Sequence, residues 1–334
     1  MSMKSSSIKL IVDSWNMQIR RYHKELADEW NALVAESKNA TFLLNRNYMD
    51  YHADRFVDAS LMMYDEHHRL LAALPANYEA DIKTVYSHHG LTYGGLIASR
   101  RITTTQVMEA LTLACRHYAE LGAVKIYYRP IPYIYNRYPS QEELFFLYRN
   151  HATLEARNLS QTIFIPDAIK MNELRRRCVK KSLNARHTIS REYDVTEFWH
   201  ILDANLRELH GVKPVHTIDE LHLLMSRFED VIRLYVVKNE AGQVIAGTIV
   251  YDMGQTVHTQ YISANAEGKA TGAFDNLISH LLSTVYKDRM YFDFGVSTEK
   301  GGNWLNEGLT FQKESFGGRG VCYDTWSLNL SEFR

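Results

Sequence analysis

The sequence has few cysteines, no long apolar run and almost no net charge, and each shortage excludes a class of protein. Cys115, Cys178 and Cys322 lie far apart, without CxxC or metal-ligand spacing, so we expect buried free thiols in a reducing compartment and no metal site. The segment Met1–Lys9 has no apolar signal core, and no run approaches the ~18 apolar residues of a spanning helix. We therefore expect a cytoplasmic protein without a transmembrane segment. A net charge of −1 produces no global field toward nucleic acid or anionic membranes.

The length and composition favour a globular protein with more than one domain. A chain of 334 residues suggests two domains, at about 150 residues for each. An apolar share of 46% is enough to build a sizeable core. The 21 tyrosines indicate aromatic walls with polar tips around a groove.

The predicted elements recur in the same order in the two halves of the chain. The repeated order is strands, a loop with glycine, an amphipathic helix, an aromatic strand, a helix and a last strand. It runs from about Ala59 to Ile165 and again from about Val231 to Leu328. Residues 107–121 and 274–285 carry apolar side chains at helical spacing, which predicts the amphipathic helix of each copy. Two copies with weak identity indicate a duplicated domain rather than a solenoid.

We therefore expect an α/β fold of two tandem domains, residues 1–165 and 166–334, with mixed and mostly antiparallel sheets. The second domain should begin with a basic helical connector over residues 166–228. Helices are expected at Ile19–Glu36, Met171–Arg191, Thr196–His210, Thr217–Phe228 (opened by the capping-box pattern Thr217…Glu220) and Trp304–Glu314.

The stretch from Tyr291 to Arg319 carries the densest set of polar residues beside a predicted strand. A short aromatic strand ends near Phe294, Gly295 breaks it, and a turn and a helix follow. A strand that leads polar residues into a turn before a helix is a frequent position for active-site groups in α/β domains. The polar residues of this stretch are Asp293, Ser297, Glu299, Asn306, Glu307, Lys313 and Arg319.

Six motifs stand out along the chain: His258-Thr-Gln-Tyr261, Tyr291-Phe-Asp-Phe-Gly-Val-Ser-Thr-Glu299, Leu305-Asn-Glu-Gly-Leu309, Phe311-Gln-Lys-Glu-Ser-Phe-Gly-Gly-Arg319, Lys213-Pro-Val-His216 and His89-Gly-Leu-Thr-Tyr-Gly-Gly95. These motifs resemble the Fem-type branch of the GNAT acyltransferase superfamily, which carries two GNAT-like domains in one chain. The resemblance implies transfer of an acyl or aminoacyl group to an amine, with the donor in the gap where two sheet strands diverge.

The family also implies a donor loop at the N-terminus of a helix, where backbone N–H groups and the helix dipole bind a pyrophosphate. The corresponding loop here is Glu267-Gly-Lys-Ala-Thr-Gly-Ala273, which departs from the Q/R-x-x-G-x-G/A pattern because its glycines are four apart and its first residue is acidic. Gly268, Lys269 and Gly272 are the expected cofactor-binding residues. Acyl-CoA is one donor that this resemblance implies, and aminoacyl-tRNA is the alternative.

Acyl transfer to an amine needs a base, an acid for the leaving group and donors for the oxyanion. Glu299 is the preferred catalytic carboxylate, with His258 and Asp293 as the other catalytic candidates. The groove is expected between the Thr256–Ser263 and Tyr291–Phe294 strands, facing the first half. Strand alternation predicts His258 and Gln260 on one face and Thr259 and Tyr261 on the other. The candidate substrate-binding residues are His216, Gln260, Tyr261, Ser297, Asn306, Lys313 and Arg319, with Tyr93 and Tyr128 as first-half walls.

These residues favour an N-acyltransferase that acts on a small or peptide-like amine, in cell-envelope precursor metabolism. Two alternatives remain open. One is a binding protein that keeps the groove without catalysis. The other is aminoacyl-tRNA-dependent transfer to a peptidoglycan precursor, in which the basic helix 175–191 binds tRNA. Each polar candidate also has a structural explanation, as part of a solvated loop or an exposed strand face.

Overall fold

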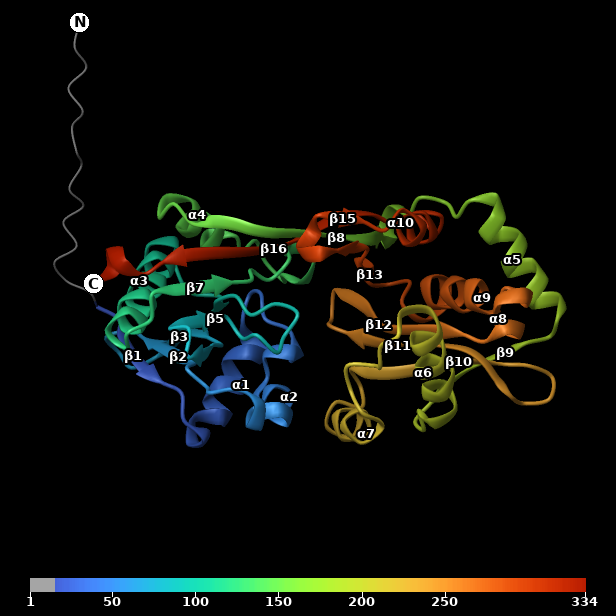
Figure 1. Cartoon of the computed structure of the whole chain (residues 1–334), viewed down its shortest axis with the longest axis horizontal. Coiled ribbons are helices and arrows are strands. Elements are labelled where there is room, and N and C mark those ends of the chain that lie inside the picture. The colour runs from blue at the N-terminus through green and yellow to red at the C-terminus, as the bar shows by residue number, and fades with distance from the viewer. Residues whose placement is uncertain (1–15) are drawn as a thin grey trace, which may run out of the picture.

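A computed structural model describes residues 16–334, apart from the side chains of residues 209 and 210. The segment Met1–Lys9 therefore lies outside the described residues. The two halves lie side by side along the long axis of the molecule (Figure 1). One sheet runs through both, in the order β4 (Asn77–Glu79), β5 (Thr84–Tyr86), β7 (Lys125–Tyr128), β16 (Arg319–Asn329), β8 (Thr153–Phe164), β13 (Tyr291–Val296), β12 (Thr256–Ala264), β11 (Val244–Asp252), β10 (Ile232–Lys238) and β9 (Thr188–Glu192).

The order of strands shows that the two halves exchange their last strands. Strand β8 ends the first half yet pairs with β13, and β16 ends the second half yet pairs with β7. Figure 1 shows the green β8 and the red β16 crossing the centre together. The pairs β5–β7 and β12–β13 are parallel, and the other strand pairs of the described residues are antiparallel. The expected tandem fold with mixed, mostly antiparallel sheets is confirmed, whereas the boundary at residue 165 stays a prediction.

The first half adds a second sheet and its own helices. This sheet has the order β1 (Gln18–Arg21), β2 (Leu61–Tyr64), β3 (Leu70–Leu74) and β6 (Ile97–Ala98). The helices here are α1 (Ala27–Glu36), α2 (Arg46–Met49), α3 (Thr104–Glu120) and α4 (Glu142–Arg149).

The second half has more helices, and they surround its part of the long sheet. They are α5 (Glu173–Asn184), α6 (Thr196–His210), α7 (Ile218–Arg227), α8 (Ala266–Thr271), α9 (Ala273–His280, followed by a π-helical turn at Leu281–Val285) and α10 (Glu307–Glu314). A short hairpin of β14 (Thr298–Glu299) and β15 (Trp304–Leu305) precedes α10. The capping box of α7 forms as predicted, because the Thr217 hydroxyl accepts from the Glu220 N–H and the Glu220 carboxylate accepts from the Thr217 N–H.

Three predicted helices are wrong at one end, and one predicted loop contains a short helix. The start of the expected helix Ile19–Glu36 is strand β1, because residues 18–21 pair with β2. The basic helix stops at Asn184, and the end expected to be helical is the edge strand β9. Trp304 lies in β15, so the last helix begins at Glu307. In the expected loop 265–272, Asn265 caps the short helix α8.

The cysteines differ in exposure, contrary to the expectation that they are buried. Cys115 is buried, whereas Cys178 is half-buried and Cys322 is exposed on β16. All three are free thiols. In residues 16–334 we find neither a helix with the length and apolarity to cross a membrane nor a cluster of His, Cys, Asp and Glu that could hold a metal ion.

Candidate active site

The candidate active site lies where β12 and β13 diverge. The two strands pair in parallel only from Thr256 and Tyr291 to His258 and Asp293. Beyond this point, β13 turns toward β8 at Gly295, whose φ of +75° suits glycine, while β12 continues beside β11. The gap opens into a pocket of about 490 Å³, which is large enough for a small ligand.

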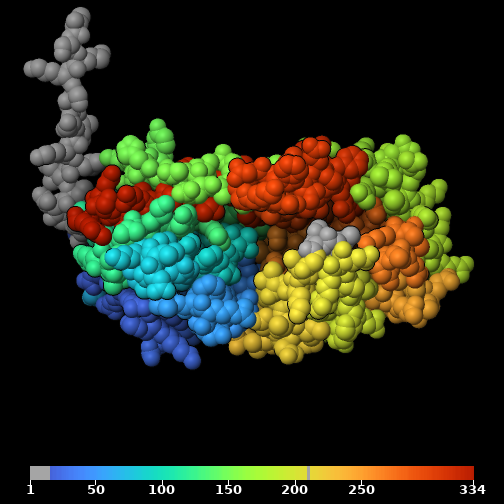
Figure 2. Space-filling view, in the orientation of Figure 1, coloured from blue at the N-terminus to red at the C-terminus, as the bar shows by residue number. Residues whose placement is uncertain are grey.

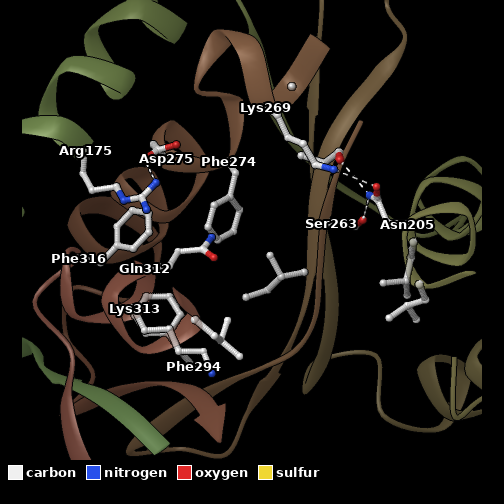
Figure 3. A pocket seen from close by; sticks show the side chains of 16 residues that line it. Arg175, Asn205, Ser263, Lys269, Phe274, Asp275, Phe294, Gln312, Lys313 and Phe316 are labelled. Carbon is white, nitrogen blue, oxygen red and sulfur yellow. Dashed lines mark hydrogen bonds and ion pairs between the residues drawn. The ribbon is translucent and has the colours of Figure 1, made fainter. Parts of the chain in front are cut away.

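One side of the pocket carries three phenylalanine rings, Phe274, Phe294 and Phe316, together with Gln312 and Lys313 of α10 (Figure 3). Leu309 of α10 also lines the pocket. On the opposite side, the Lys269 ammonium donates to the Asn205 carboxamide at 3.0 Å, and Asn205 donates to the Ser263 hydroxyl at 2.6 Å. The space-filling view shows a recess between the orange-red segment that includes α10 and the yellow segment that includes α6 (Figure 2).

His258 and Asp293 form a hydrogen-bonded pair at the point of divergence. His258 Nδ1 lies 2.7 Å from Asp293 Oδ2, and Asp293 is fully buried. Burial alone would raise the pKa of this carboxyl, but hydrogen bonds and the charge of His258 hold it well below its usual range. Four hydroxyls surround the carboxylate: Ser160 and Thr162 donate to Oδ1 at 2.5 and 2.7 Å, and Tyr135 and Tyr323 lie 3.0 and 2.8 Å from Oδ2.

The ionised Asp293 selects one tautomer of His258. A carboxylate only accepts hydrogen bonds, so the neutral imidazole carries its proton on Nδ1 and leaves Nε2 as a proton acceptor. The ring packs over the backbone of Gly295, where a Cβ would lie 3.2 Å from His258 Cε1. Glycine at this position therefore provides both the positive φ and the space for the ring.

Lys313 reaches the same bend of β13 from α10. Its ammonium donates to the carbonyls of Gly295 at 2.7 Å and Val296 at 2.9 Å. Burial lowers the pKa of Lys313 to about 8, an effect that the charge of Asp293 partly opposes. An ammonium has three N–H donors, so one remains beyond these two bonds. A base nitrogen and a cation thus flank one bend of the chain.

Strand β12 contains a β-bulge that changes the expected faces. Ile249 pairs with Tyr261 and Val250 pairs with Thr259, which leaves Gln260 as the extra residue. Tyr251 and Ile249 share a face of β11, so their partners His258 and Tyr261 also share a face. The expectation that these two residues point to opposite faces is therefore wrong.

Other sequence-predicted residues near the site are already engaged in contacts. The His216 ring is buried, with Nδ1 2.6 Å from the Tyr261 hydroxyl, and does not line the pocket. Ser297 is buried and donates to Gln161 at 2.5 Å. Arg319 is exposed on the surface, where it donates to the Gly318 carbonyl.

Glu299 lies outside the pocket, contrary to the expected groove position. It is exposed on the β14–β15 hairpin, where the Asn306 amide donates to it at 3.0 Å. Asn306 itself caps α10 by accepting from the Leu309 N–H. These two side chains have clear local roles at the start of α10.

The two first-half tyrosines expected to line the groove are buried in cores. The Tyr128 hydroxyl donates to Glu143, another buried residue of the first half. The Tyr93 hydroxyl contacts Thr41 and the Met253 sulfur. Their expected role as exposed walls of the groove is therefore wrong, because burial removes both hydroxyls from solvent.

The loop expected to bind a pyrophosphate does not fit that group at the N-terminus of α9. Gly268 and Lys269 line the pocket, but a Cβ on Gly272 would lie 2.5 Å from the Cys178 carbonyl of α5. Asp275 occupies the first turn of α9 and accepts from Arg175 at 2.9 Å. A pyrophosphate would meet this carboxylate and the backbone of α5.

The four hydroxyl groups that surround Asp293 were not predicted from the sequence. Tyr135, Ser160 and Thr162 come from the first half of the chain, and Tyr323 comes from the exchanged strand β16. For Tyr135 one sequence pattern was available, because Pro130 and Pro132 make the segment after β7 rigid and so restrict the position of Tyr135. No sequence pattern connects the other three with Asp293.

Comparison with known families agrees with this geometry. Residues 170–303 match the acetyltransferase (GNAT) domain family, a range that includes His258, Asp293 and most of the pocket. The match shows a GNAT-type acetyltransferase domain in residues 170–303, and GNAT domains generally take acyl groups from acyl-CoA. A search of curated proteins found no match to this sequence.

Solved structures show the same fold over nearly the whole chain. FemX superimposes with a TM-score of 0.70 and 10% identity, covering 94% of this chain and 98% of its own. L-PGS from Bacillus licheniformis gives 0.59 with 11% identity, covering 93% of each chain. The C-terminal domain of a putative lysylphosphatidylglycerol synthetase from Agrobacterium fabrum gives 0.59 with 11% identity, covering 92% and 93%. The resemblance to Fem-type tandem GNAT proteins is therefore confirmed for the fold.

Proposed function

We propose that this protein is an N-acyltransferase that moves an acyl or aminoacyl group from a donor in the β12–β13 pocket to an amine. The observation that carries the proposal is that the His258–Asp293 pair and the Lys313 ammonium both contact Gly295. Lys313 lines the pocket, whereas His258 and Asp293 lie next to it and are not part of its lining. An amine of a cell-envelope precursor, such as a peptidoglycan peptide, is the acceptor that the Fem-type resemblance supports.

Each group has a defined part in the proposed reaction. The acceptor attacks as the neutral amine, His258 Nε2 removes one proton from its nitrogen, and Asp293 stabilises the imidazolium that forms. The amine nitrogen bonds to the acyl carbon, whose oxygen gains negative charge. The remaining N–H of Lys313 donates to this oxygen. Collapse of the tetrahedral intermediate breaks the bond to the leaving group, which receives the proton from His258.

An acylated tRNA is the donor that a second observation favours over acyl-CoA. Helix α5 covers the start of α9 and lines the pocket with Arg175, while it exposes cations on its outer side. The exposed cations are Arg176, Arg177, Lys180 and Lys181. Such a row of cations suits the phosphate backbone of a tRNA, which stays outside the pocket while the acylated end of the tRNA enters it. The name of the Agrobacterium fabrum neighbour, a putative lysylphosphatidylglycerol synthetase, supports aminoacyl transfer on this fold.

A binding experiment with a blocked pocket tests the proposal. Leu309→Trp places an indole in the pocket wall, and Phe311→Trp is its matched control because Phe311 is 59% exposed on the same helix. A donor at 100 times its Kd stabilises the wild type by about 2.7 kcal/mol, and we expect Leu309→Trp alone to lose this stabilisation. Thermal shifts with acetyl-CoA, aminoacylated tRNA and deacylated tRNA are compared. Equal shifts in both variants contradict the pocket assignment.

The same measurement separates the two donor classes. If tRNA is the donor carrier, its affinity falls steeply with salt and falls further in a Lys180→Glu, Lys181→Glu double variant. A saturable shift with acetyl-CoA that the double variant leaves unchanged identifies acyl-CoA as the donor instead.

A further inference from the structure

We infer that Tyr135 of the first half is a positioning residue for His258 and Asp293, so that the reaction in the second half depends on docking of the first half. The inference rests on the proposed function and concerns the side of the imidazole away from the acceptor. Tyr135 ends a 3-10 helix, Tyr133–Tyr135, that follows β7.

The backbone of this 3-10 helix is bonded to the start of β12. The Ile134 carbonyl accepts from the Gln255 amide at 2.9 Å and from the Thr256 hydroxyl. Thr256 is the first residue of the parallel pairing that ends at His258 and Asp293. The position of Tyr135 is therefore determined by the strand that carries His258.

The Tyr135 hydroxyl joins the cluster around Asp293 at close range. It lies 3.0 Å from Asp293 Oδ2, 2.7 Å from the Tyr323 hydroxyl and 3.3 Å from His258 Nδ1. Burial, together with the charge of Asp293, raises the pKa of Tyr135 well above its usual value, so the hydroxyl stays protonated and donates. Its contact with Nδ1 is on the side of the ring opposite Nε2, so it orients the pair without touching the acceptor.

Through these contacts, the first half of the chain helps to position the catalytic pair of the second half. With one proton each, Tyr323 donates to Asp293 while Tyr135 donates to Asp293 or to Tyr323. Either arrangement restrains the carboxylate that selects the His258 tautomer. A first half displaced from the second would remove the contacts that Tyr135 makes with this pair.

The test compares Tyr135→Phe with Tyr118→Phe, a first-half tyrosine whose buried hydroxyl donates to the Ala59 carbonyl at 2.9 Å, away from Asp293. Proton NMR of histidine-labelled protein follows the His258 Nδ1 proton, assigned by its absence in His258→Gln. We expect its resonance to move or broaden in Tyr135→Phe and to stay in place in Tyr118→Phe. In turnover assays, we expect kcat to fall about tenfold in Tyr135→Phe, with donor KM unchanged.

An unmoved Nδ1 resonance in folded Tyr135→Phe overturns the inference. If this variant does not fold, Gln255→Ala takes its place, because it removes one of the two side chains that hold the Ile134 carbonyl. An unmoved resonance there overturns the inference equally. The NMR measurement needs no turnover, so it decides the role of Tyr135 even if no acyl transfer is found and the proposed function fails.

Discussion

Replacing His258 by glutamine is expected to lower kcat by about 10²- to 10⁴-fold, the usual contribution of a general base. Glutamine can still donate to Asp293 but cannot take a proton from the acceptor. The carboxylate also keeps its four hydroxyl partners, so we expect the variant to fold. The measurement is single-turnover acyl transfer with saturating donor.

Two variants act as controls for this prediction. His200→Gln makes the same change at an exposed position of α6 and should keep wild-type activity. Glu299→Gln tests the carboxylate favoured by the sequence, and its exposed position on the hairpin predicts a change of less than about twofold, since surface substitutions are usually near neutral. If Glu299→Gln is inactive and His258→Gln is active, the assignment of His258 as the base is wrong.

Replacing Lys313 by methionine is expected to lower kcat by about 10²- to 10³-fold, which is the effect of removing one oxyanion donor. The change also leaves the Gly295 and Val296 carbonyls without this donor, which costs about 1–3 kcal/mol of stability. Lys287→Met, at an exposed position, is the matched control and should change neither quantity. Full activity in folded Lys313→Met would contradict the proposed role.

The pH dependence gives Lys313 a second, independent test. The protonated form donates the hydrogen bond, and its pKa is lowered to about 8, so we expect the wild-type rate to fall as the pH rises through about 8. Arginine stays charged over this range. We therefore expect Lys313→Arg, where it retains activity, to lose this alkaline decline. A decline of the same size and midpoint in Lys313→Arg would assign it to another group.

Local patterns in the sequence determined most of the helices and the strands around the site. The Thr217–Glu220 capping box and the aromatic strand at Tyr291 depend on neighbours within a few residues, and both appear as expected. The tandem order of elements also follows from patterns of this kind, whereas the hydrogen bond between His258 and Asp293 was not predicted. The ends of some elements were predicted wrongly, as β9 shows, because an edge strand forms only against its partner, here β10.

Contacts between distant residues were decided only by the tertiary structure. The exchange of β8 and β16 places Thr162 and Tyr323 around Asp293, and docking of the halves adds Tyr135, 158 residues away in sequence. The bulge at Gln260 turns Tyr261 toward the face of His258, and the packing of α5 closes the start of α9. These features depend on which surfaces meet after folding, and hydrophobic periodicity carries no information about a partner more than a few residues away. The sequence alone therefore determined the strands that carry the base, whereas its partners, its environment and the shape of the donor pocket arose from long-range packing.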